Sequence, residues 1–207
     1  PSTVETITLD DVRAYYTAHI PSHLTGVTVS ASLPQAEITA ALQGFASLDV
    51  TEAYRIPMDG LREMKGRALY LVNKEGAAQS SLRTAQPSIK YDALGDYYKA
   101  GLANFNLGGT FNSRINLNLR EDKGYTDGAR SGFRGGQELG SFGVSSEVNK
   151  DATAASVTEV LNELESYAND GMNEEEYDYM RSAIGQRDAL QYETPGRKLG
   201  LLGNIMR

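Results

Sequence analysis

Apolar and polar residues recur with two different periods along this chain, and the period changes several times. Apolar residues three or four positions apart are typical of amphipathic helices, and this spacing occurs at residues 8–18, 34–45, 94–105, 157–168 and 177–190, and again from residue 194. Strands are predicted at residues 24–33, where Val27 and Val29 alternate with polar residues, and at residues 68–73, 79–86, 126–137 and 139–149. The pattern predicts helices interspersed with strands, the last two strands forming a hairpin.

Local signals mark some of the helix ends. Thr8 followed by Asp11 resembles a capping box, in which two residues satisfy each other's free backbone N–H groups. Pro34 suits the first turn of a helix, because its missing N–H has no partner there in any case. Gly108-Gly109 is expected to end the preceding helix, since glycine enters the left-handed backbone region without strain.

The composition is that of an ordinary folded domain. A chain of 207 residues with 40% hydrophobic content can bury a substantial core. It has no Cys, which excludes a disulfide scaffold, but a domain of this size needs no disulfides in either the periplasm or the cytoplasm. The compartment is therefore left open. No run of residues is apolar and long enough to predict a membrane segment.

The charge of the chain argues against a nucleic-acid partner. The net charge is -7, and residues 151–180 contain nine acids without a Lys or Arg. These acids are expected on solvated faces and in the first turns of two helices, where the helix dipole favours negative charge. They are Asp151, Glu159, Glu163, Glu165, Asp170, Glu174, Glu175, Glu176 and Asp178.

The two histidines do not form a promising metal site. His19 and His23 have the i, i+4 spacing of two ligands on one helical face. Pro21 lies between them, removes a helical hydrogen bond and disfavours the helical region for Ile20. The two side chains are therefore expected around the end of a helix, and no metal ligand is predicted in this chain.

A charged segment that leads through a glycine into a strand is the most specific motif of the sequence. It reads Leu119-Arg120-Glu121-Asp122-Lys123-Gly124-Tyr125-Thr126-Asp127-Gly128. This arrangement resembles the segment that closes the active-site chamber in the insulinase/pitrilysin-type (inverzincin) zinc metallopeptidases, which include the mitochondrial processing peptidases. The resemblance covers about residues 69–202, including the glycine-rich stretch from Leu107 to Arg114 and the segment from Gln191 to Pro195.

The resemblance implies a fold and a division of the chain. It implies an α+β fold, with a mixed, largely antiparallel sheet and helices mainly on one face, as in a processing-peptidase-like repeat domain. Residues 1–50 resemble the helix-strand-helix piece that closes one repeat, and residues 51–65 read as a linker. Residues 66–207 resemble the main part of the following repeat, cut short. The two parts are expected to pack as one α+β domain, with strand 24–33 pairing in the sheet of the second part.

Residues 113–120 fit two patterns. Ile115, Leu117 and Leu119 alternate like a strand, whereas the resemblance implies a short helix with Ile115 and Leu119 in the core. We follow the resemblance, because Asn112-Ser113 is a good helix start and the polar Asn116 and Asn118 need not be buried.

The chain lacks the residues that hold zinc in this family. The family binds zinc through an inverted H-x-x-E-H helix and a distant Glu, which supply two neutral imidazoles and a carboxylate that primes water. None of that pattern occurs here. The chain thus resembles the portion without the zinc motif, and zinc is expected in the parent polypeptide or a partner half.

The resemblance also implies candidate site residues. In the family an Arg, and a Tyr seven residues later, face the zinc and contact the substrate and the developing oxyanion. The Arg matches Arg120, whereas Asp127 replaces the Tyr, and a carboxylate only accepts hydrogen bonds. Gly108, Gly109 and Tyr125 are candidate substrate contacts.

A simpler interpretation of the same motif stays open. Arg120 and its charged neighbours could be an exposed helix end with weak surface ion pairs. Gly124 would then be the C-cap, with Tyr125 packing over it.

Two functions follow as hypotheses. The chain is the non-zinc-binding part of a zinc-dependent endopeptidase, contributing chamber wall and substrate contacts, and is inactive by itself. Alternatively, it is an inactive homologue that binds peptides or a partner subunit. The expected partners are unfolded peptides or short polypeptides, and other repeat domains of the same chain or a partner subunit. A sheet edge would receive the peptide.

Overall fold

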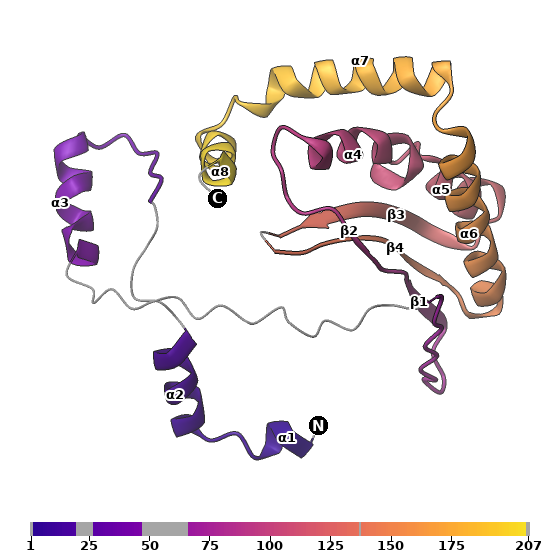
Figure 1. The fold of residues 1–207 in the computed structure, drawn as a ribbon, viewed down its shortest axis with the longest axis horizontal. Helices are drawn as coiled ribbons and strands as arrows, with labels where there is room; N and C mark the ends of the chain where they lie inside the picture. The colour runs from indigo at the N-terminus through magenta and orange to yellow at the C-terminus, as the bar shows by residue number, and fades with distance from the viewer. Residues whose placement is uncertain (1, 20–26, 47–65, 137, 206–207) are drawn as a thin grey trace. The chain divides into compact units, whose positions relative to one another are not determined.

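A computed structural model describes residues 2–19, 27–46, 66–136 and 138–205 (Figure 1). The chain forms two compact units, Pro1–Glu63 with Tyr192–Arg207 and Met64–Gln191. The expected linker at residues 51–65 lies outside the described residues. The division of the chain into two repeat pieces stays a prediction.

The regular elements among the described residues of the first unit are helices. Thr8 and Asp11 form the expected capping box, since the Thr8 N–H donates to Asp11 Oδ2 at 2.8 Å and the Asp11 N–H donates to Thr8 Oγ1 at 3.2 Å. Hydrogen bonds from Thr8 hold the pKa of the Asp11 carboxyl below its usual value. The helices are α1 (Ser2–Glu5), α2 (Leu9–His19), α3 (Gln35–Ala46) and α8 (Pro195–Ile205).

The strand expected at residues 24–33 does not form over the described part of that range. Residues 24–26 lie outside the described residues, and residues 27–33 are extended or bent without a ladder partner. Alternation of Val27 and Val29 with polar residues was the basis for the prediction. A strand also needs a neighbour to receive its backbone hydrogen bonds, and the described residues provide none here.

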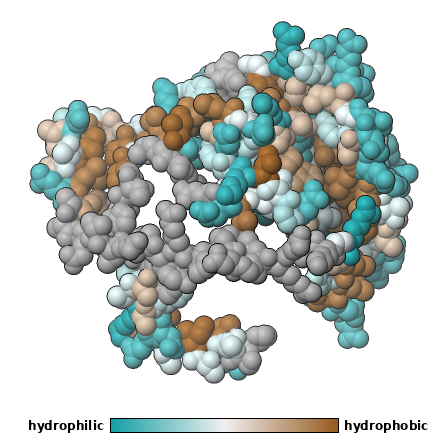
Figure 2. Space-filling view, in the orientation of Figure 1, coloured by the Kyte–Doolittle hydropathy of each residue, from teal (hydrophilic) through white to brown (hydrophobic). Residues whose placement is uncertain are grey.

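The helices of the first unit keep many apolar side chains at the surface. Figure 2 shows hydrophobic residues at the surface of α1 and α3. An amphipathic helix usually buries its apolar side against another element. The exposed set is compatible with the expectation that this piece completes a larger domain. It comprises Val4, Ile7, Leu9, Val12, Tyr15, Tyr16 and Phe45.

The second unit is built on an antiparallel sheet with β4 in the middle. Ser145 of β4 pairs with Arg83 of β1 and with Arg130 of β3, so these two strands flank β4. β2 continues along the same edge as β1, because Phe142 pairs with both Gln86 and Phe133. The strands are β1 (Gln79–Arg83), β2 (Gln86–Ser88), β3 (Thr126–Gly135) and β4 (Gly140–Asn149). This confirms the predicted hairpin.

The strand expected at residues 68–73 is absent. The chain there is irregular, and Leu69, Tyr70, Leu71 and Val72 are 83–89% exposed. The following turn does form, with the Ala77 N–H donating to the Lys74 carbonyl at 3.3 Å. The apolar run suits a buried strand, but no described strand pairs with it.

The helices of the second unit lie on one side of the sheet (Figure 1). Residues 114–122 are helical, and Ile115 and Leu119 are 0% and 1% exposed, as the resemblance implied. Leu94, expected in an apolar stripe, is 91% exposed, because it precedes the helix. The helices are α4 (Asp96–Asn104), η1 (Phe105–Gly109), α5 (Arg114–Asn116), η2 (Leu117–Asp122), η3 (Lys150–Ala152), α6 (Thr153–Asp170) and α7 (Glu174–Gln191). The α+β class is confirmed.

The core lies between this helical layer and the sheet. Leu82, Tyr125, Phe133, Leu164 and Tyr167 pack around the buried cluster. That cluster comprises Leu107, Ile115, Leu119, Ala129, Phe142, Val144 and Val160.

The helical stretch ends at Gly109, as expected, but neither Gly108 nor Gly109 adopts the left-handed conformation. They belong to the π-helical turn η1, and neither has a positive φ. A Cβ at Gly108 would lie 2.2 Å from Ser131 Oγ and 2.6 Å from the Ser131 N, so glycine permits η1 to pack directly on β3. The left-handed conformation occurs instead at Gly124, with φ 63°, after the residue Lys123 that caps η2.

Candidate functional site

The sheet has one apolar face under the helices and one open polar face. Along β4, Phe142, Val144 and Val148 are buried, whereas the alternate residues Ser145 and Glu147 are more exposed. The same alternation in β1 and β3 turns Leu82 and Ala129 to the core and Arg83 and Arg130 to the open face. Polar side chains from three strands therefore gather on the face that the helices leave uncovered.

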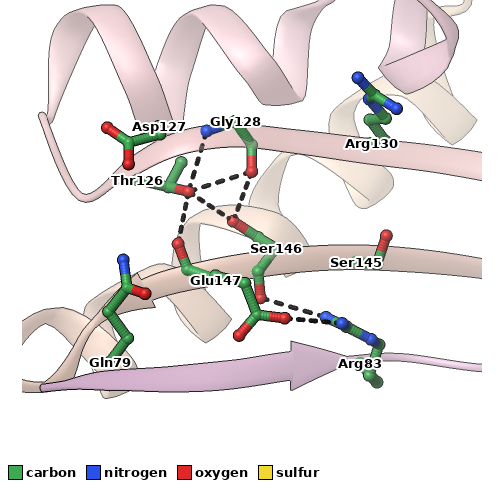
Figure 3. Close-up of a pocket in the computed structure, with 9 residues that line it drawn as sticks. All are labelled: Gln79, Arg83, Thr126, Asp127, Gly128, Arg130, Ser145, Ser146 and Glu147. Carbon is green, nitrogen blue, oxygen red and sulfur yellow. Dashed lines mark hydrogen bonds and ion pairs between the residues drawn. The ribbon is translucent and has the colours of Figure 1, made fainter.

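The candidate site is a cavity of about 470 Å³ on this open face (Figure 3). All three long strands contribute to it. Its lining is Gln79, Arg83, Thr126, Asp127, Gly128, Arg130, Ser145, Ser146 and Glu147. Among the candidate residues derived from the sequence, only Asp127 belongs to the lining.

A bulge at the start of β3 positions Asp127. The pairing of β3 with β4 shifts between Thr126 and Ala129, and such bulges redirect a side chain. Thr126 Oγ1 donates to the Glu147 carbonyl at 2.6 Å and accepts from the Gly128 N–H at 3.1 Å. Ser146 Oγ donates to the Gly128 carbonyl at 3.0 Å. These bonds fix the backbone on both sides of Asp127, whose exposed carboxylate has no hydrogen bond or ion pair with another described residue.

Arg83 and Glu147 form an ion pair within the cavity. Arg83 Nη2 lies 2.6 Å from Glu147 Oε1, and Ser81 Oγ donates to the same oxygen at 2.9 Å. The hydrogen bond from Arg83, followed by that from Ser81, holds the pKa of the Glu147 carboxyl below its usual value. The side chains are 58% and 50% exposed, so solvent screens the pair and its contribution to stability is small.

Arg120 lies outside the cavity. It belongs to η2, pairs with Glu121, and its Cζ lies 4.4 Å from the centroid of the Phe111 ring. Its side chain is 33% exposed, so this ion pair is not a buried one. The structure thus does not bring Arg120 and Asp127 into one described pocket. A substrate contact by either residue stays a prediction.

Tyr125 packs against the core, on the other side of the chain from Asp127. Its N–H donates to the Leu119 carbonyl at 2.8 Å, and its carbonyl accepts from the Asn149 N–H at 2.8 Å. Two residues apart in a regular strand, Tyr125 and Asp127 would share a face, but the bulge that begins after Thr126 interrupts the alternation. Gly124 as a helix-ending residue, with Tyr125 packed beside it, agrees with the simpler interpretation of this motif.

Gly108 and Gly109 surround a buried polar contact. Asn104 Nδ2 donates to the Ser131 carbonyl at 3.0 Å, and Ser131 Oγ donates to Asn104 Oδ1 at 2.5 Å. Gly108 is buried and Gly109 is exposed. Packing explains the glycine at position 108, and substrate contacts by the two glycines stay a prediction.

Asn116 and Asn118 are less solvated than expected from the sequence. Asn116 is buried, donating to the Phe111 carbonyl at 2.7 Å and accepting from the Ala129 N–H at 2.9 Å. Asn118 is half-buried and donates to Glu159 Oε2 at 3.1 Å and to Glu163 Oε1 at 2.7 Å. The Asn116 amide therefore ties α5 to β3, and the Asn118 amide ties η2 to α6, neither of which periodicity predicts.

Glu176, expected in a solvated helix turn, instead anchors α7. Arg114 Nε and Nη2 donate to the two carboxylate oxygens of Glu176 at 2.5 and 2.6 Å, and the side chains are only 23% and 19% exposed. The hydrogen bonds from Arg114 lower the pKa of the Glu176 carboxyl, and Glu176 in turn raises the pKa of Arg114. Glu176 also forms a capping box with Asn173, through contacts of 2.8 and 2.9 Å.

The described residues do not offer a zinc site. No three His, Asp or Glu side chains among them gather closely enough to hold a metal ion. His23 and the side chain of His19 lie outside the described part of the chain. The donor groups that the structure describes therefore do not fit the zinc of the resembled peptidases.

A membrane-spanning helix is likewise not found among the described residues, because none of their helices is both long and apolar enough.

Comparison with known proteins places the chain in a family. Three solved structures share its fold: a peptidase M16 inactive domain from Pseudomonas fluorescens (22% identity, TM-score 0.67), a protease from Helicobacter pylori (18%, 0.74) and a conserved protein from Enterococcus faecalis V583 (17%, 0.66). They match 97%, 98% and 99% of this chain, which spans 47%, 50% and 48% of theirs. No curated protein matches. The family model of the peptidase M16 inactive domain matches residues 6–184, and the chain belongs to this family.

Proposed function

We propose that this chain is the non-zinc-binding part of a zinc-dependent endopeptidase and contributes a wall of its substrate chamber. The observation that carries the proposal is the open polar face of the sheet, where the cavity lies. Membership of a family of inactive peptidase domains supports a role beside the catalytic site rather than in it. One solved structure with this fold is a protease, in which the matched part is about half of the chain.

The zinc and the water that it activates would belong to the parent polypeptide or to a partner half. When bound, the metal supplies Lewis-acid chemistry and a nucleophilic water at neutral pH. The described residues of this chain lack the donors for it. They would bind and orient the substrate.

Each candidate residue has a distinct capacity toward a peptide. Arg120 carries five N–H donors that suit a peptide carbonyl or carboxylate, and its contacts with Glu121 and Phe111 restrict its orientation. Asp127 can accept hydrogen bonds from a peptide N–H or from a basic side chain, and it cannot stabilise an oxyanion. No described strand pairs with the edge of β3 that faces away from β4, and this edge would offer backbone groups to an extended peptide.

Asp127 also favours a second function. A carboxylate replaces the phenol that the resemblance implies at this position, and it lines the cavity without an ion pair to another described residue. A homologue that binds peptides or a partner subunit without aiding catalysis would tolerate this exchange.

Peptide binding by the isolated chain tests the proposal. A fluorescein-labelled unstructured peptide, blocked at both ends, is titrated with the chain and followed by fluorescence anisotropy. Saturable binding that unlabelled peptide reverses is expected, without cleavage, because zinc ligands are missing. The absence of saturable binding would contradict a substrate-chamber role.

A further inference from the structure

A row of three polar side chains crosses the open face of the sheet. Arg83 on β1 pairs in register with Ser145 on β4, and Ser145 pairs with Arg130 on β3. Neighbouring strands are about 4.8 Å apart, so the two arginines start about 10 Å apart with the serine between them. Figure 3 shows the Ser145 side chain between those of Arg83 and Arg130. Two long cationic side chains can thus converge above one hydroxyl group.

Arg83 already holds a carboxylate at this face. Its Nη2 contacts Glu147 Oε1 at 2.6 Å, while Nη1 donates to the Leu82 and Ser146 carbonyls at 2.8 and 3.3 Å. These contacts hold the guanidinium and leave Nε without a hydrogen-bond acceptor among the described residues. The internal pair demonstrates that a carboxylate fits the chemistry of this surface.

Arg130 is the available cation of the row. It is exposed, and its guanidinium makes no hydrogen bond or ion pair with another described residue. Two acids share the cavity with it, but Glu147 is bound to Arg83, and Asp127 makes no ion pair with Arg130. An arginine fork without a carboxylate can bind one from outside in bidentate geometry.

The β3 position of the neighbouring row leaves room for a ligand backbone. Gly132 pairs with Gly143, so no side chain rises from these two positions. A Cβ at Gly132 would meet nothing within 4 Å, whereas a Cβ at Gly143 would lie 2.3 Å from the Thr84 carbonyl oxygen, so the open space lies over Gly132 of β3 and not over Gly143 of β4. Arg134 lies one row further along the same face, opposite Ser141. An extended segment could lie along β3 over Gly132 and direct one side chain to Arg130 and Ser145.

We propose that Arg130, assisted by Ser145 and Arg83, binds the side-chain carboxylate of an Asp or Glu in an extended peptide. The inference rests on the proposed function and names the class of peptide that the open face selects. An isolated acidic residue is preferred to an acidic run, because Asp127 and Glu147 lie in the same cavity and repel further negative charge. The two carboxylates also disfavour a polyanion such as nucleic acid.

Two matched peptides test the acidic preference. They are blocked at both ends, so that no terminal carboxylate remains, and differ only by Glu or Gln at the central position. The Glu peptide is expected to bind the chain about three- to tenfold more tightly, in the range of an exposed charge-assisted contact. The preference should fall at high salt.

Substitutions at the exposed arginines test which residue produces the preference for the Glu peptide. Arg130→Gln is expected to abolish the preference, bringing the two dissociation constants together. Arg134→Gln is the matched control, since it removes the same charge from the same strand and face, and it should retain the preference. Glu147→Gln releases Arg83 and should increase the preference. Circular dichroism checks that each variant is folded.

The outcomes separate this inference from the proposed function. Equal binding of the two peptides by the unmodified chain would overturn the acidic preference while leaving peptide binding intact. Loss of the preference in Arg134→Gln as in Arg130→Gln would indicate a general charge effect and would also overturn the assignment to the row. Failure of both peptides to bind would contradict the proposed function itself.

Discussion

Removal of the Glu176 carboxylate should destabilise the second unit far more than removal of its exposed neighbour. Glu176→Ala leaves Arg114, which is 23% exposed, without its counter-ion, and it opens the capping box with Asn173. The Arg114 guanidinium also lies over Tyr167, with Cζ 4.8 Å from the ring centroid. The variant thus disturbs the contact between α5 and the first turn of α7.

The magnitude follows from the burial of the pair. Breaking a fully buried ion pair costs about 3–5 kcal/mol, whereas an exposed pair contributes about 0–1 kcal/mol. A pair that is about one-fifth exposed lies between these limits and nearer the buried one, and loss of a cap adds about 1 kcal/mol. We expect a loss of about 3 kcal/mol in the free energy of unfolding.

Urea denaturation followed by circular dichroism measures this loss. With a slope of about 1–3 kcal/mol per molar urea, a loss of about 3 kcal/mol should lower the midpoint by about 1–3 M. Glu175→Ala is the matched control, because Glu175 shares the first turn of α7 and is exposed. A midpoint shift for Glu176→Ala no larger than that for Glu175→Ala would refute the anchoring role. A double-mutant cycle with Arg114→Ala then isolates the pair itself.

Further predictions concern pH, packing and activity. The folded-state pKa of Glu176 is lowered, so its stabilisation is present above the unfolded value of about 4.3 and is lost as the pH falls through the folded pKa; the stability difference between the unmodified chain and Glu176→Gln should vanish at low pH in urea titrations. Gly108→Ala should cost about 1–3 kcal/mol in urea denaturation, because its Cβ would lie 2.2 Å from Ser131 Oγ, whereas Gly132→Ala, with nothing within 4 Å, should cost less. Arg120→Ala in the parent enzyme should reduce kcat/KM about tenfold or more. An unchanged kcat/KM would indicate that Arg120 forms only surface ion pairs and does not contact the substrate. Asp127→Tyr in the parent should raise peptidase activity at unchanged zinc content, because the phenol restores a donor; flat or lower activity would favour the non-catalytic function.

Local patterns predicted most of the secondary structure because the relevant interactions are local. The capping box at Thr8, the helices of residues 153–191 and the hairpin of β3 and β4 follow from side-chain periodicity and turn residues. The segments 27–33 and 68–73 have strand-like composition, yet they form no strand. Strand formation depends on a partner edge, and its position is not encoded in the segment itself.

The composition of the candidate site depended on long-range register. Alternation along β3 turns Arg130 to the face of the sheet away from the core, because Ala129 faces the core. It does not reveal that Arg83 and Arg130 flank Ser145. The bulge between Thr126 and Ala129 also puts Tyr125 at the core and Asp127 at the cavity, which simple strand alternation would not do. Arg114 and Glu176 are separated by 62 residues, so their pairing could not be predicted from spacing.

The central claim, that peptides contact the open face of the sheet, can be tested at single positions because the chain has no Cys. Gln79→Cys places a fluorophore at the cavity, and Glu175→Cys places the same fluorophore on exposed α7. Addition of an unlabelled, unstructured peptide is predicted to change the emission at position 79 saturably and to leave position 175 unchanged. A saturable change at position 175 without one at position 79 would contradict the account.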